Sequence, residues 1–171
     1  MLDSFFVYLQ LLMTIGLIYL SWSLQSEFKA FKKQMETQPV KNDEGNKLRL
    51  QSLERLTLFA ERCGLAALVA RLDCSGLSAA AYHQVLTSTI KSEFEYNISQ
   101  QVYVSPEVWN AVSRLKDQNI YVINHITANL APHATSIDLS KLILEYSNTP
   151  NAEMNVIVLD ALQYEAKKLL N

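Results

Sequence analysis

The sequence predicts an all-α protein, in which an N-terminal transmembrane helix precedes a bundle of about five helices. The first observation is an uncharged apolar run near the N-terminus, long enough to span a bilayer. The second is the spacing of apolar residues by three and four positions through the remainder of the chain. The third is the scarcity of helix-breaking residues, with four Gly and four Pro in 171 residues. The expected segments are an outer tail (1–4), the transmembrane helix (5–24), a juxtamembrane helix and linker (25–46), and a helical domain (47–171).

The run from Phe5 to Leu24 contains no charged residue. About 20 helical residues measure about 30 Å, which matches the hydrocarbon thickness of a bilayer. Aromatic residues lie at both ends of the run, Trp22 among them, as is typical of side chains at the membrane interface. The alternatives are a cleaved signal peptide and a buried helix of a globular domain. The run lacks a positive leader and is longer than a signal-peptide core, so we expect a retained span.

The lysines after this run predict its orientation. Lys29, Lys32 and Lys33 follow the run, whereas no Lys or Arg precedes it. Positively charged residues remain on the cytoplasmic side, so we expect the N-terminus outside and the helical domain in the cytoplasm. The same lysines could attract anionic membrane lipid, although a role as topology signal alone explains them equally well. Two unpaired cysteines, Cys63 and Cys74, agree with a reducing compartment.

Five helices are expected after the linker. Ser78 is a good N-cap for the second, and Ser105-Pro106-Glu107 is the clearest helix start in the chain. Ser136 and Asp138 open the fourth, and Asn148–Asn151 separates it from the last. The expected helices cover 48–72, 78–97, 105–130, 136–146 and 152–170.

Three stretches leave room for other structures. Pro39 and the polar run that ends at Gly45-Asn46 predict a break before the domain. An extended conformation competes at Val102–Val104. A strand is the second possibility at Ile120–Ile123, because β-branched residues favour strands.

The chain shows no catalytic, cofactor-binding or metal-binding motif. Glycine-rich phosphate loops, His-Glu-x-x-His and Cys-x-x-Cys are all absent from the sequence. His83, His125 and His133 fall on different expected elements, and no His/Cys/Asp/Glu cluster has metal-ligand spacing. We interpret His125 as a partly buried structural histidine and Cys63 as a small core residue. No cofactor and no enzymatic activity are therefore expected.

The charge of the chain and one tryptophan bear on its partners. The net charge is −2, so the sequence offers no basic surface for nucleic acid. Trp109 directly follows a helix start and is a candidate interaction residue, since Trp is favoured at interface hot spots. The other interpretation of Trp109, a side chain packed against the core, is favoured.

The stretch SEFEYNISQQVYVSPEVW (Ser92–Trp109), together with the early anchor helix, resembles a family of small single-pass membrane proteins of unknown function from Bacteroidota-type bacteria. The resemblance covers the anchor and most of the helical domain. It carries no catalytic motif and so assigns no residue a role. It implies a location in the bacterial inner membrane and a domain that recurs as a unit.

The leading functional hypothesis is a non-enzymatic adaptor or accessory subunit of an inner-membrane complex, which binds an unidentified protein partner through its cytoplasmic domain. The second is a membrane-tethered enzyme whose polar groups converge only in the folded chain. The third is a structural homo-oligomer, packed through Gly16 and one face of the bundle.

Overall fold

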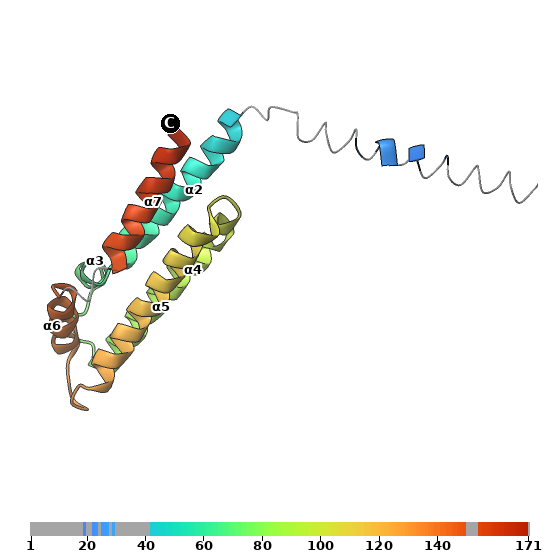
Figure 1. The fold of residues 1–171 in the computed structure, drawn as a ribbon. Coiled ribbons are helices and arrows are strands. Elements are labelled where there is room, and N and C mark those ends of the chain that lie inside the picture. Colours follow the sequence, from blue (N-terminus) through green and yellow to red (C-terminus); the bar gives the residue numbers. More distant parts are fainter. Residues whose placement is uncertain are drawn as a thin grey trace, which may run out of the picture. The chain divides into compact units, whose positions relative to one another are not determined.

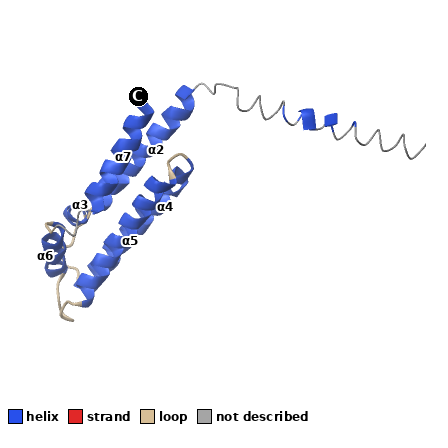
Figure 2. Cartoon of the chain, viewed as in Figure 1, coloured by secondary structure: helices blue, strands red, loops and turns tan. Residues whose placement is uncertain are grey.

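The computed structural model describes residues 19, 22–23, 25–27, 29, 42–149 and 154–170. The described residues form helices and connecting loops with no β-strand, which confirms the all-α prediction (Figure 2). The chain divides into two compact units, Met1–Asn42 and Asp43–Asn171.

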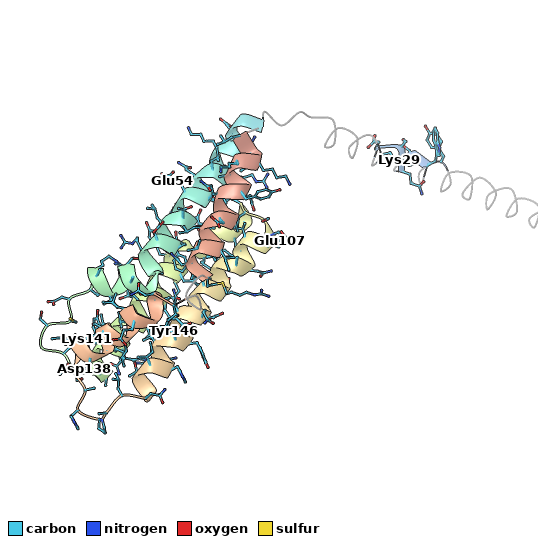
Figure 3. The ribbon with its side chains drawn as sticks, turned by 60° about the vertical axis from the view of Figure 1, so that its left-hand side comes forward. Lys29, Glu54, Glu107, Asp138, Lys141 and Tyr146 are labelled. Atoms are coloured by element: carbon cyan, nitrogen blue, oxygen red, sulfur yellow. The ribbon has the colours of Figure 1, made fainter. Side chains whose placement is uncertain are left out.

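Within the first unit the described residues are helical. Trp22 and Lys29 are among them, and both side chains are exposed (Lys29 is labelled in Figure 3). Most of the expected transmembrane helix 5–24 lies outside the described residues, as do Lys32 and Lys33. In the part of the chain that the structure describes, no helix has the length and apolar character needed to cross a bilayer.

The second unit is a helical bundle (Figure 1). Helix α4 packs along α5, while α6 packs against α3, α4 and α5. The short helix η1 connects α4 and α5 at one end of this pair, and α6 lies near the other end. The described helices of this unit are α2 (Asn42–Cys63), α3 (Leu65–Arg71), α4 (Ala79–Asn97), the 3₁₀ helix η1 (Ile98–Val102), α5 (Pro106–Ala128), α6 (Ser136–Ser147) and α7 (Met154–Leu170).

The first expected helix, 48–72, is in fact two helices. Gly64 has an extended backbone (φ −56°, ψ 135°) and separates α2 from α3. A side chain at this position would meet α7, because a Cβ on Gly64 would lie 3.2 Å from Asn155 Nδ2. A glycine at the break therefore leaves room for Asn155 of α7. Helix α2 also begins at Asn42, several residues before the expected start.

The predicted caps of α4 and α5 are present. The Ser78 hydroxyl accepts a hydrogen bond from Ala81 N at 3.2 Å, and that of Ser105 accepts one from Val108 N at 3.3 Å. Helix α6 differs in register, since Thr135 rather than Ser136 is its N-cap. The Thr135 hydroxyl and backbone N–H both donate to the Asp138 carboxylate, which lowers the pKa of Asp138.

Neither stretch considered as extended forms a strand. Val102 ends η1, and Tyr103 after it has helical dihedral angles (φ −107°, ψ −9°). Ile120–Ile123 lies inside α5. There Val122 and Ile123 are buried while Tyr121 is exposed, so the burial pattern of a helix overrides the β preference of these residues.

A single hydrophobic core runs through the bundle and receives side chains from α2 to α7. Two backbone hydrogen bonds join the loop before α4 to the loop before α6. Ala79 N donates to Ala134 O at 3.0 Å, and Ser136 N donates to Leu77 O at 3.1 Å. These two bonds hold the starts of α4 and α6 together. The largest fully buried side chains include Leu56, Phe59, Leu68, Tyr82, Leu86, Ile90, Leu115, Ile123, Leu139 and Ile143.

Candidate protein-binding groove

A groove of about 660 Å³ lies between α2 and η1, and we call it the α2–η1 groove. Arg55 lines it together with exposed apolar side chains from both elements. Val102 is the most exposed of these, at 75%. The apolar lining residues are Leu48, Leu58, Val102 and Tyr103.

Local contacts hold the two walls of this groove in place. Arg49 Nε on α2 donates to the Tyr103 carbonyl at 3.3 Å, which ties the end of η1 to α2. Arg55 lies over the ring of the exposed Tyr96 of α4 at 5.1 Å, and this contact holds the arginine side chain in place. Exposed apolar patches with polar rims mark binding surfaces, and Tyr and Arg are enriched in protein interfaces. The groove is therefore a candidate site for binding a protein.

A second groove, of about 480 Å³, lies where the start of α5 meets α2 and α7. Ser105, Glu107, Glu165 and Lys168 line it, and Glu107 is visible at the start of α5 in Figure 3. The Glu165 carboxylate accepts hydrogen bonds from the Ser105 N–H at 3.0 Å and from its hydroxyl. A carboxylate at a helix N-terminus is stabilising, so this Ser–Glu pair has a structural explanation as the cap of α5.

The predicted interaction residue, Trp109, packs against the core. Its ring stacks on Phe94 at 5.2 Å, and Phe94 meets Phe59 edge-on at 5.9 Å. Trp109 is half-buried, in agreement with the core interpretation that the sequence favoured. As an interaction residue Trp109 stays a prediction.

The three histidines remain apart. His83 Nε2 lies 2.6 Å from Asn124 Oδ1, so His83 is the histidine held by a side-chain hydrogen bond between helices. The expected burial of His125 is wrong, because its side chain is exposed and stacks on Tyr121 at 6.0 Å. Helical periodicity explains this error, since the neighbours Val122 and Ile123 occupy the inner face of α5. Among the described residues, no three His, Cys, Asp or Glu side chains gather as a metal site would require.

Cys63 is fully buried at the end of α2, as a core residue. Burial raises the pKa of its thiol to about 12, and the nearby Glu93 carboxylate adds to this effect. The Glu93 carboxylate on α4 binds Arg62 of α2 at 2.7 Å and lies 3.6 Å from Arg71 of α3.

The Cys63 thiol is expected to resist alkylation in the folded protein. A thiol with a pKa near 12 is almost entirely protonated at pH 8, and the thiolate is the reactive form. Peptide mapping after iodoacetamide treatment at pH 8 should find Cys63 unmodified in the folded protein. In guanidinium chloride at about 6 M, above ordinary unfolding midpoints, Cys63 should be fully modified. Rapid native modification would show that this end of α2 opens.

The fold and the groove define a class of protein, a small all-α bundle with a partly apolar groove on its surface. The chain belongs to the DUF7935 family, a family of unknown function whose model matches residues 1–169. Neither a curated protein nor a solved structure matches the chain. The resemblance to a family of unknown function is thus confirmed, while membrane anchoring and a Bacteroidota origin stay predictions.

Sequence reasoning did not find the residues of the α2–η1 groove. Val102 and Tyr103 stood out only as a short stretch where an extended conformation competes. Leu58 was one apolar residue of a helix whose buried face runs through other positions. The one usable signal was that Leu58 lies off the face defined by Leu53, Leu56 and Ala60.

Proposed function

We propose that this protein is a non-enzymatic, membrane-anchored adaptor or accessory subunit, which binds a partner protein in the α2–η1 groove. The observation that supports the proposal is the exposure of Leu48, Leu58 and Val102 around one groove that Arg55 also lines. Exposed apolar residues cost little as single residues on a surface, but a contiguous group of them favours association.

The chemistry of the groove favours an amphipathic protein segment as the partner. Aliphatic side chains of the partner would cover Val102 and Leu48, and an acidic residue would pair with Arg55. An apolar site whose lining also holds an acidic and a basic side chain, Glu54 and Arg55, gives both affinity and orientation to such a segment.

The second part of the proposal is the anchor. The uncharged run 5–24 and the lysines Lys29, Lys32 and Lys33 support a single-pass protein of the inner membrane, with its helical domain in the cytoplasm. Anchoring confines adaptor and partner to the same surface and raises their effective concentration, so that a modest groove suffices. Lipid around the anchor would be the other partner. The alternative of a membrane-tethered enzyme has less support, because His125 and His133 line neither groove.

Val102→Asp tests the groove. A charge on this exposed side chain should leave the fold intact but should lower the recovery of a stoichiometric partner at least tenfold. The measurement is quantitative mass spectrometry of the full-length tagged protein, purified in detergent from native membranes.

The matched control is Val156→Asp, which alters another exposed valine, on α7. It should recover the partner as the wild type does. An unchanged partner yield with Val102→Asp would reject the groove, whereas release of the whole chain from membranes by alkaline carbonate would reject the anchor.

A further inference from the structure

The outer face of α2 carries opposite charges on its two sides. Leu58 lies at the middle of this face and is 56% exposed. Residues three and four positions away lie on either side of it, because each residue of a helix turns by about 100°. Glu54 and Glu61 therefore lie on one side of Leu58, and Arg55 and Arg62 lie on the other.

The grooves beside α2 agree with this division. Glu54 and Glu61 line a groove of about 560 Å³ between α2 and α7. Arg55 and Arg62 line a smaller hollow between α2 and α4. Leu58 lines both, so it forms the ridge between an acidic side and a basic side, and Glu54 is visible on α2 in Figure 3.

This arrangement is complementary to itself in one orientation. Consider two copies whose α2 helices run parallel, with a two-fold axis along the helices and the two Leu58 side chains at that axis. The acidic side of each α2 then faces the basic side of the other. Glu54 then lies about 1.5 Å in height from Arg55 of the second copy, since consecutive residues rise by that distance. Glu61 of one copy lies opposite Arg62 of the other in the same way. In an antiparallel pair the same rotation would oppose Glu to Glu and Arg to Arg.

We propose that the α2 ridge, formed by Gln51, Glu54, Arg55, Leu58, Glu61 and Arg62, binds a second copy of this chain in a parallel two-fold dimer. Apolar burial of the two Leu58 side chains supplies attraction, and the four charge pairs select the partner and the orientation. Gln51, Glu54, Arg55 and Leu58 also line the α2–η1 groove, so a second copy on the ridge and the groove partner proposed above compete for these side chains.

Contacts with α4 hold both basic side chains of the ridge in place. Arg55 is held over the Tyr96 ring at 5.1 Å. Arg62 donates to Glu93 through Nε and Nη2, yet its side chain remains 50% exposed. Holding an arginine in place reduces the entropy that it loses on binding. A parallel pair also suits two chains anchored through their N-termini in one membrane, a point that rests on the proposed function.

Leu58→Asp tests the contact at its centre. Two carboxylates would meet at the two-fold axis, so the dimerisation constant of the full-length protein in detergent should fall at least tenfold. Sedimentation velocity across a range of protein-to-detergent ratios measures this. Leu142→Asp, a change of an exposed leucine on α6, is the control and should dimerise as the wild type does. A monomeric wild type, or a Leu58→Asp dimer of unchanged strength, would overturn the proposal.

A charge exchange tests the selection. Glu54→Arg places two arginines against each other in the dimer, and Arg55→Glu places two glutamates there, so each variant alone should dimerise weakly. An equimolar mixture should form the heterodimer, because every pair is then opposite in charge. Both variants should unfold at the same denaturant concentration as the wild type. If they do and the mixture still forms no dimer, the pairing of Glu54 with Arg55 of the second copy is ruled out.

Cross-linking distinguishes the orientations. In a Cys74→Ser background, Gln51→Cys and Leu58→Cys should both form intermolecular disulfides, because a parallel pair brings each residue close to its own copy. Cross-linking of Leu58→Cys alone would mean an antiparallel pair and would overturn the parallel dimer. Val102 lies on η1, outside the ridge, so Val102→Asp should lower capture of the groove partner and leave self-association of the purified protein unchanged.

Discussion

Phe59→Ala is expected to lower the free energy of unfolding by about 3–5 kcal/mol, the usual range for truncating a buried phenylalanine. Phe59 is 1% exposed, and its ring meets Phe94 edge-on at 5.9 Å. Removing it leaves a cavity between α2 and α4 and deletes one ring of the Phe59–Phe94–Trp109 series.

The measurement is denaturant unfolding of the full-length chain in detergent, followed by Trp109 fluorescence in a Trp22→Phe background. Leu142→Ala is the control on an exposed side chain and should change stability by about 0.5 kcal/mol or less. A small effect of Phe59→Ala would mean that α2 is not part of the cooperative core.

Asn119→Asp is expected to destabilise the protein by about 3–5 kcal/mol at pH 7, as for a buried charge without a partner. Asn119 is 5% exposed, and its Nδ2 donates to the Cys63 carbonyl at 2.8 Å, where the chain bends at Gly64. A carboxylate cannot donate this hydrogen bond, so it would face the carbonyl oxygen and lose its hydration.

The loss should depend on pH in a defined direction. Burial raises the pKa of the introduced carboxyl in the folded state above its unfolded value of about 3.9. Below the unfolded pKa the carboxyl is protonated in both states and can donate to the Cys63 carbonyl, so the loss of stability is small. As pH rises from the unfolded pKa to the folded pKa, the loss of stability grows. Unfolding of wild type and variant at pH 4 and pH 7 measures the difference.

The matched control is Asn129→Asp. Asn129 Nδ2 also donates to a backbone carbonyl at 2.8 Å, that of His125, but the residue is exposed. Water can solvate a charge there, so the expected change is below about 1 kcal/mol. Equal penalties at the two positions would show that burial of Asn119 does not matter.

Much of the fold could be predicted because local signals and burial agree. Ser78 and Ser105 are helix caps whose chemistry acts within three residues, and both begin helices as expected. The single expected helix 48–72 failed at Gly64. Local preference tolerates one glycine inside a helix, whereas the approach of Asn155 from α7 is a contact across 91 positions of sequence, a separation visible only after folding.

The candidate site was less predictable than the fold. Tryptophan is a residue type that is frequent at interface hot spots, which made Trp109 a candidate. Its packing on Phe94, however, depends on how α4 meets α5. The α2–η1 groove arises where the end of η1 returns to α2 through Arg49 and Tyr103, which lie 54 positions apart. Residues that become neighbours in this way leave no spacing pattern in the chain.

By itself the sequence determined the helical class, the caps of α4 and α5, and the charge pattern around Leu58, because each depends on residues within one or two turns of each other. Only the tertiary structure decided which side chains stay exposed. Leu58 is left outside while its neighbour Phe59 is buried, and Val102 is exposed beside α2. The physical reason is that burial depends on which helices cover a residue, and those helices come from distant parts of the chain.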